Sequence, residues 1–162
     1  MHSALVELDT PCCATLRLNK QNKVTYVRDW KIIEADVVDF DFSAYREIDL
    51  LSGGPPCQPF SLAGKRSGRS DRREMFPHFI RAVRECQPKS FIIENVKGLL
   101  DRSFSNYFNY IVHQLRFPQL LRRKGEKWFE HKARLERLYA VPRQHKLDSL
   151  RRLRKRGILA HL

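Results

Sequence analysis

Short apolar runs alternate with helical patterns along most of this chain, and that alternation limits the folds it can adopt. The predicted strands are residues 4–8, 24–27, 35–38, 48–51 and 90–94. The predicted helices run over residues 10–22, 73–87 and 105–116. The continuous apolar run at 90–94 is typical of a buried parallel strand. The sequence therefore predicts an α/β fold in three layers, with a parallel sheet whose functional residues gather at the carboxyl ends of its strands.

Local signals set the bounds of the predicted helices. Thr10 is expected to be the N-cap of the first helix, with Pro11 in its first turn. Pro77 is tolerable in the second helix because it lies in the first turn, and Pro118 ends the third helix. The apolar side of the third helix is Tyr107, Phe108, Ile111, Val112 and Leu115.

Positive charge is concentrated toward the end of the chain. Residues 121–162 carry 14 Lys/Arg against 4 Asp/Glu, whereas residues 1–120 carry 17 against 14, which together give the net charge of +13. We expect one sheet-and-helix domain over residues 1–120 and a basic tail of exposed helix, with little to form a core, over residues 121–162. The charge favours an anionic partner such as nucleic acid, and the alternative is a solvated helix without a partner.

Several classes of protein are disfavoured by the sequence. No stretch approaches 18 consecutive apolar residues and no signal peptide is apparent, so we expect a cytoplasmic protein without a membrane span. The four cysteines form no CxxC pair and no Cys/His ligand spacing, and the six histidines form no cluster, so neither a disulfide framework nor a metal site is expected. Cys12, Cys13 and Cys86 are expected to pack as small apolar side chains.

Two segments of the sequence contain residues that could catalyse a reaction together. Residues 53–61 read Gly-Gly-Pro-Pro-Cys-Gln-Pro-Phe-Ser, which places Cys57 on a turn stiffened by prolines, and Glu94 ends the apolar run of the last predicted strand. A thiolate that adds to C6 of cytosine, with a carboxylic acid that shares a proton with N3, makes C5 nucleophilic enough to take a methyl group. Cys57 and Glu94 fit these two roles.

The same segments make the chain similar to a known family. Pro-Cys-Gln-Pro-Phe-Ser at residues 56–61 matches the catalytic loop of DNA cytosine-5 methyltransferases of the restriction-modification type, and Glu-Asn-Val at residues 94–96 matches their second motif in order and separation. The resemblance implies that Cys57 is the covalent nucleophile, that Glu94 holds cytosine N3 and its amino group, and that Asn95 helps hold the catalytic loop. It implies duplex DNA as the partner, with a flipped base. The expected DNA contacts are Ser61, Lys65, Arg66 and Arg69, mostly on a mobile loop.

The resemblance also implies S-adenosylmethionine as the cofactor. Its ribose hydroxyls would be held by Glu7 and its adenine by Asp36 and Val37, while Pro56 and Met75 would line the same pocket. Taken alone, Glu7 and Asp36 would more often be ordinary strand-end carboxylates. Their order relative to the catalytic pair favours the functional interpretation.

The resemblance covers at most residues 4–138 and is incomplete at both ends. Neither the glycine-rich Phe-x-Gly-x-Gly turn that opens the family's fold nor the late target-recognition region is found in this sequence. We therefore expect an incomplete Rossmann-like methyltransferase sandwich, possessing a partial catalytic domain over residues 1–120 and a basic helical tail, whose activity as a fragment is in question.

Three alternatives stay open from the sequence. A tRNA cytosine-5 methyltransferase would use the same two motifs. A non-catalytic, basic nucleic-acid-binding remnant would use the charge of residues 121–162 alone. Half of a split enzyme would need a complementing polypeptide.

Overall fold

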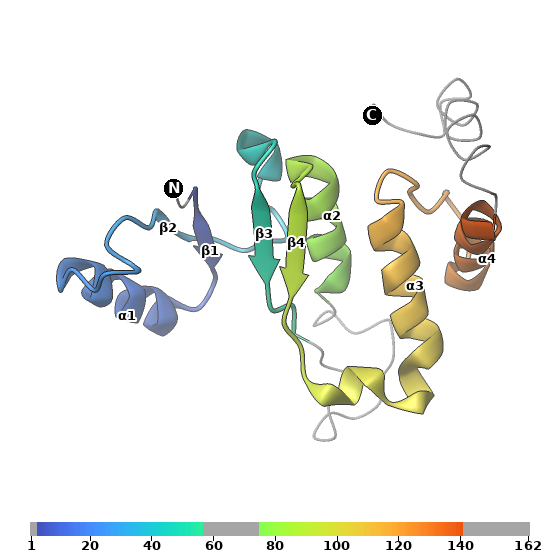
Figure 1. Cartoon of the computed structure of the whole chain (residues 1–162), viewed down its shortest axis with the longest axis horizontal. Helices are drawn as coiled ribbons and strands as arrows, with labels where there is room; N and C mark the ends of the chain where they lie inside the picture. Colours follow the sequence, from blue (N-terminus) through green and yellow to red (C-terminus); the bar gives the residue numbers. More distant parts are fainter. Residues whose placement is uncertain (1–2, 57–74, 141–162) are drawn as a thin grey trace. The chain divides into compact units, whose positions relative to one another are not determined.

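The computed structural model describes residues 3–56 and 75–140, which form short strands and helices (Figure 1). The chain divides into two compact units. The first unit lies within Met1–Leu51 and Glu85–Ser90, and the second within Ser52–Arg84 and Phe91–Leu162. Both contain strand and helix, so the α/β class is confirmed.

The first unit is built on a parallel β-α-β segment. Strand β1 (Leu5–Glu7) pairs with β2 (Ile32–Glu34) in parallel, and helix α1 (Thr10–Gln21) connects them. The N-cap of helix α1 is Asp9, one residue before the predicted cap Thr10, which is instead the first residue of the helix. Asp9 Oδ1 accepts a hydrogen bond from the Cys12 N–H at 2.8 Å. A carboxylate can accept this bond and favours the positive end of the helix, so Asp9 takes the role predicted for Thr10.

Two predicted strands are wrong, and both are turns. Residues 24–27 close a turn in which the Val27 N–H donates to the Val24 carbonyl at 2.9 Å. Residues 35–38 follow β2, and there Asp36 Oδ1 accepts the Val38 N–H at 2.8 Å. Such a side-chain bond to the backbone two residues on stabilises a turn, which overrides the β propensity of the valines. A 3-10 helix, η1 (Phe42–Tyr45), comes next.

Strands β3 (Leu50–Gly53) and β4 (Ser90–Ile93) form a second two-stranded sheet. The flanking backbone bonds from Lys89 to Ile48, from Ser90 to Asp49 and from Glu94 to Gly53 advance together along both chains, so the strands are parallel. The strand predicted at 90–94 is confirmed, but its predicted burial is wrong, because Ile92 is 56% exposed. The sheet has only two strands among the described residues, so much of this apolar run remains uncovered.

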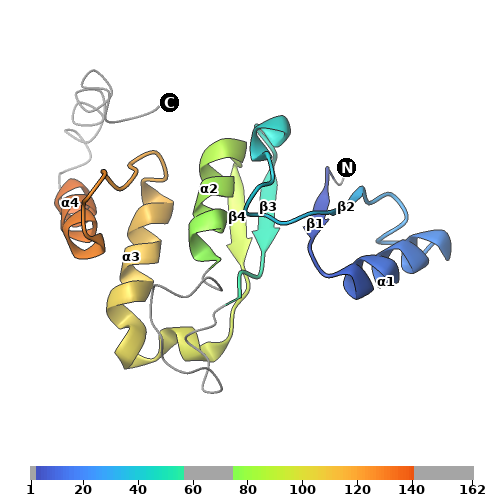
Figure 2. The ribbon, with the colours of Figure 1, turned by 180° about the vertical axis from the view of Figure 1, so that it is seen from behind.

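The second unit holds the larger core. Helix α2 (Phe76–Cys86) packs on β4 through the rings of Phe79 and Phe91, whose centroids are 6.1 Å apart. The 3-10 helices η3 (Lys97–Leu100) and η4 (Arg102–Phe104) lead into α3 (Ser105–Arg116), which packs beside α4 (Trp128–Ala140) (Figure 2). The buried cluster is Phe76, Leu99, Tyr107, Tyr110, Ile111, Leu120, Leu135 and Leu138.

Helix α4 corrects the expectation that residues beyond 120 have little to form a core. Leu135 is fully buried and Leu138 is 9% exposed, both in the cluster that includes α3. Two leucines at helical spacing, Leu135 and Leu138, rather than the net charge, therefore decide the packing of this segment. No helix in residues 3–56 and 75–140 is long and apolar enough to cross a membrane.

Candidate active site

The Glu94 carboxylate lies over Gly54, at the point where both strands of the second sheet end. The Glu94 N–H donates to the Gly53 carbonyl at 3.1 Å, which extends the β3–β4 pairing by one step. A Cβ at position 54 would lie 3.2 Å from Glu94 Oε2. Because glycine has no Cβ, the carboxylate can approach the start of the proline-rich turn closely.

Asn95 ties the two motif segments together. Its Nδ2 donates to the Pro55 carbonyl at 2.7 Å, and its Oδ1 accepts the Val96 N–H at 3.0 Å. Both ends of the amide are therefore used, which fixes its orientation. The bonded residue, Pro55, is buried and lies two positions before Cys57.

Cys57 itself lies outside the described residues, as do Ser61, Lys65, Arg66 and Arg69. The other three cysteines, Cys12, Cys13 and Cys86, are described, and their thiols are not suited to act as nucleophiles. Burial raises the pKa of Cys13 and of Cys86, and a hydrogen bond to Asp9 raises the pKa of Cys12, which is exposed rather than packed as predicted. A raised pKa lowers the thiolate fraction, so none of these three is activated as a nucleophile.

In the first unit, three carboxylates follow the carboxyl ends of the parallel pair. Glu7 and Glu34 are in register at the ends of β1 and β2, and Asp36 follows two residues later. Both carboxylate oxygens of Glu34 already accept hydrogen bonds, since Thr10 Oγ1 and Arg17 Nη1 each donate to it at 2.7 Å. These bonds lower the pKa of Glu34. Glu7 Oε1 accepts the Asp9 N–H at 2.8 Å, and Oε2 has no donor among the described residues. One edge of this sheet thus holds a carboxylate oxygen available to a ligand.

The predicted cofactor residues are divided between the two units. Glu7, Asp36 and the half-buried Val37 belong to the first unit, whereas Pro56 and Met75 belong to the second. The Met75 carbonyl accepts the N–H groups of His78 and Phe79 at 3.1 and 3.2 Å, so its backbone caps α2.

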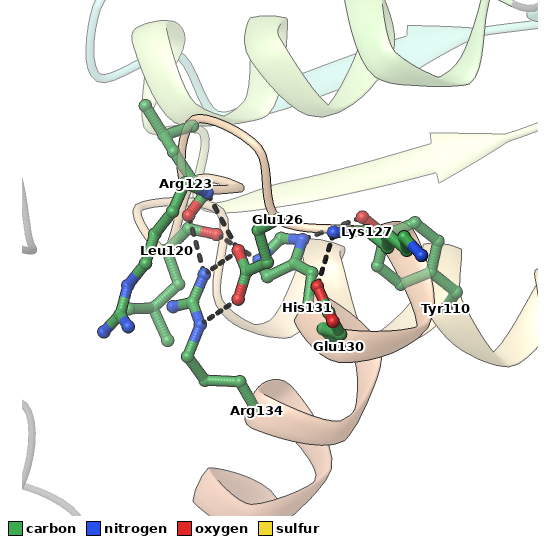
Figure 3. Close-up of polar contacts among 9 residues, drawn as sticks. Tyr110, Leu120, Arg123, Glu126, Lys127, Glu130, His131 and Arg134 are labelled. Carbon is green, nitrogen blue, oxygen red and sulfur yellow. Dashed lines mark hydrogen bonds and ion pairs between the residues drawn. The ribbon is translucent and has the colours of Figure 1, made fainter.

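Sequence reasoning missed a polar cluster that joins α3 to α4 (Figure 3). The hydroxyl of Tyr110 lies 2.7 Å from Nδ1 of the buried His131, whose Nε2 lies 2.8 Å from the Leu120 carbonyl. A carbonyl only accepts, so Nε2 carries the proton and Nδ1 accepts from Tyr110. The six histidines are not clustered in the sequence, so the sequence gave no sign that His131 would pair with Tyr110.

An ion pair between Arg134 and Glu126 in the same region strongly shifts the pKa of its carboxylate. Both nitrogens of the Arg134 fork, Nε and Nη2, bond Glu126 at 2.8 Å, and these bonds lower the pKa of Glu126 to about 2. Arg134 Nη2 also donates to the Leu121 carbonyl at 2.8 Å. This cluster has a structural role, because the bonds of Arg134 hold the loop before α4 against that helix. Within residues 3–56 and 75–140, no group of three His, Cys, Asp or Glu side chains could hold a metal ion.

Parallel strands with polar residues at their carboxyl ends place this chain in the α/β class, in which ligands commonly bind at that edge of the sheet. Residues 1–118 match the family model described as C-5 cytosine-specific DNA methylase, and the chain belongs to this family. It is 49% identical over 113 residues to the Type II methyltransferase M.NgoMIV of Neisseria gonorrhoeae, a match that covers 70% of this chain and 34% of that protein.

Two further relatives support the same assignment. The Type II methyltransferase M.AquIA of Picosynechococcus sp. is 48% identical over 120 residues, which cover 70% of this chain and 46% of that protein. The Type II methyltransferase M.PspPI of Psychrobacter sp. is 37% identical over 142 residues, which cover 86% of this chain and 31% of that protein. The chain thus spans between about a third and a half of the length of these relatives.

Proposed function

We propose that this chain carries the catalytic pair of a DNA cytosine-5 methyltransferase, which transfers a methyl group to C5 of cytosine in duplex DNA. The observation that carries the proposal is the contact between the two motif segments. Asn95 bonds the Pro55 carbonyl and the Glu94 carboxylate lies over Gly54, so the carboxylate is held at the start of the turn that leads to Cys57.

In this proposal the two residues divide the chemistry of one covalent step. The Cys57 thiolate forms a bond to C6 of a flipped cytosine while Glu94 shares a proton with N3, and the electron pair of the C5–C6 bond becomes available at C5. After C5 takes the methyl group, its proton passes to solvent water and the C6–S bond breaks to release the Cys57 thiolate, which restores the aromatic ring. A carboxyl group near an exposed strand end can exchange its proton with solvent between cycles.

The residues of the first unit fit part of the proposed cofactor, S-adenosylmethionine, which supplies an activated methyl group. Glu7 Oε2 has no donor among the described residues and can accept from two ribose hydroxyls. Asp36 and Val37 lie on the turn after the neighbouring strand, where a carboxylate and an apolar side chain can hold an adenine. Pro56 and Met75 would complete the pocket.

The proposal extends to DNA contacts and to the fold. Ser61, Lys65, Arg66 and Arg69, which follow the catalytic cysteine in sequence, would contact the duplex. The two parallel pairs, each with a helix connection, would belong to a Rossmann-like three-layer sandwich. Membership of the C-5 cytosine-specific DNA methylase family, together with similarity to Type II methyltransferases, favours DNA over tRNA as the substrate.

Covalent capture tests the proposal directly. The purified chain is incubated with S-adenosylmethionine and a duplex in which 5-fluorocytosine replaces cytosine, because fluorine at C5 blocks the final elimination. We expect a complex stable on a denaturing gel that disappears in Cys57→Ala and forms at least about tenfold more slowly in Glu94→Gln.

Control reactions separate the possible failures. A labelled tRNA in place of the duplex measures substrate preference, and stronger capture of tRNA would contradict the DNA assignment. Capture that persists in Cys57→Ala would overturn the assignment of the nucleophile. If DNA binds but is not captured, this chain alone does not perform the reaction.

A further inference from the structure

A hollow of about 840 Å³ lies on the second unit, beyond the residues that the family model matches. It is formed by the loop before α4 and by the first residues of that helix. Its lining is Arg122, Arg123, Lys124, Gly125, Glu126, Lys127, Trp128 and Phe129, which we call the cationic loop. Neither the catalytic pair nor the proposed cofactor residues belong to it.

The cationic loop carries excess positive charge at its surface. Arg122, Arg123, Lys124 and Lys127 are all exposed, and Glu126 is the one carboxylate of the lining. That carboxylate is compensated from outside the lining, because Arg134 bonds both of its oxygens at 2.8 Å. The four exposed cations are therefore not neutralised by Glu126. Lys127 Nζ lies over the Phe129 ring, 5.7 Å from its centroid, and Arg122, Arg123 and Lys124 can meet a polyanion.

Aromatic surface accompanies these cations. Phe129 is 49% exposed and meets Trp128 edge to face, with ring centroids 6.0 Å apart. Trp128 is itself held against the buried Tyr110, at a centroid distance of 5.9 Å. The exposed ring of Phe129 is thus backed by a packed ring, which fixes its position beside the charges.

The loop is also held rigid by bonds that leave its exposed side chains available. The Arg123 N–H donates to Glu126 Oε2 at 2.8 Å, and the Glu126 N–H donates to the Arg123 carbonyl at 3.0 Å. Between them Gly125 has a positive φ of 79°, which glycine adopts without strain. A pre-ordered loop loses little conformational entropy when it binds a partner.

We propose that the cationic loop binds single-stranded nucleic acid, as a site separate from the catalytic pair. Phosphates would lie on Arg122, Arg123 and Lys124, and an unpaired base would stack on Phe129. Cations beside an exposed, rigid aromatic ring are the combination that recognises single strands. An acidic polypeptide would match the charge but would offer no flat face to the ring. This site goes beyond the proposed methyl transfer and does not depend on Cys57.

Binding of a fluorescent single-stranded oligodeoxynucleotide to the whole chain, at several salt concentrations, tests the site. Replacing Arg122, Arg123 and Lys124 together by alanine should weaken binding at least about tenfold and lower the slope of log K against log salt by about 2, or about 0.7 for each lost phosphate contact. Phe129→Ala should weaken binding about 5- to 100-fold, and Phe129→Tyr should restore it.

The matched control replaces Arg28, Lys31 and Arg46, three exposed cations of the first unit, by alanine. It removes the same net charge and should change the slope by less than about 0.5. The proposal is overturned if the two triple variants lose equal affinity, or if Phe129→Ala binds like the unmodified chain. It is also overturned if a poly-glutamate peptide of equal charge binds as tightly, which would indicate an acidic protein partner. Cys57→Ala should bind normally, so failure here is distinguishable from failure of the catalytic proposal.

Discussion

Two neighbouring glycines at the end of β3 are constrained by different neighbours. A Cβ on Gly53 would lie 2.9 Å from the ring of Phe79, and a Cβ on Gly54 would lie 3.2 Å from Glu94 Oε2. The first neighbour is part of the packing of α2, whereas the second is a proposed catalytic group. The pair of glycines therefore serves packing and site geometry at adjacent positions.

We expect Gly54→Ala to impair the site more than the fold. The carboxylate of Glu94 is exposed and can shift by a few tenths of an ångström, so the free energy of unfolding should change by less than about 1 kcal/mol. Covalent capture should slow about tenfold, because the carboxyl group is displaced. Thermal unfolding and the capture rate, measured on the same samples, check both effects.

Gly53→Ala is the matched control for this prediction. Its Cβ meets a packed aromatic ring rather than a flexible carboxylate, so it should lower the free energy of unfolding by about 1–3 kcal/mol. Equal stability losses in the two variants would show that position 54 is constrained by packing instead.

Asn95 offers a second test at the residue scale. Asn95→Ala leaves the Pro55 carbonyl without its donor at a part-buried position, which should cost about 1–2 kcal/mol of unfolding free energy. Asn95→Asp keeps the shape but replaces the donor by an oxygen that repels the carbonyl, and it should cost at least as much. If capture and stability are both normal in Asn95→Asp, the amide bond does not hold the turn.

At this scale the sequence predicted some roles and missed others for identifiable reasons. The motif match implied that Asn95 helps hold the loop, and its bond to Pro55 is consistent with that role. Cys12 was wrongly expected to pack inside, because burial depends on which face of α1 it occupies. The prediction for Cys57 stays a prediction, since that residue lies outside the described ranges.

At the scale of elements, periodicity was reliable where an apolar stripe was long and unreliable in short runs. Helix α3 was predicted with the bounds that it has, Ser105–Arg116, from its apolar side and the proline that follows. The strands predicted at residues 24–27 and 35–38 were wrong because the β propensity of a four-residue run cannot outweigh local hydrogen bonds that stabilise turns. For α4, the abundance of cations obscured the leucines that anchor it.

Acid should loosen the contact between α3 and α4. Burial lowers the pKa of His131 below its ordinary value of 6.5, so the unfolded chain binds this proton more readily than the folded one. The stability associated with the neutral ring is therefore fully present above pH 6.5 and is lost as the pH falls below it. The free energy of unfolding should decline by up to about 1.4 kcal/mol per pH unit for this group.

Urea unfolding between pH 8 and pH 5 checks the effect, with His131→Gln expected to flatten the pH dependence. His113 must be controlled for, because burial lowers its pKa as well and its Nδ1 is buried without a hydrogen-bond partner in the described residues. His113→Gln should remove only its own share of the slope. A pH dependence that His131→Gln leaves unchanged would assign the effect to other groups.

At the scale of the whole molecule, the two units differ in how much core they hold. The first unit buries Cys13, Phe42 and Cys86 below 9% exposure, whereas the second contains a cluster of eight buried residues. Because local stability follows buried apolar contact, the second unit should open less often than the first. Sequence composition suggested one core for the chain and could not reveal this division, which depends on how the segments fold back on one another.

Hydrogen exchange followed by mass spectrometry should resolve the difference. Amides of α3 and α4 are expected to exchange more slowly than those of α1. Leu135→Ala, which removes a fully buried side chain and should cost about 2–5 kcal/mol, is expected to accelerate exchange in α3 and α4 and leave α1 nearly unchanged. Leu18→Ala, at a residue 56% exposed on α1, is the control and should alter neither region. If Leu135→Ala accelerates exchange equally in all three helices, the two units unfold together, because the energy lost in one core is then shared by the whole chain.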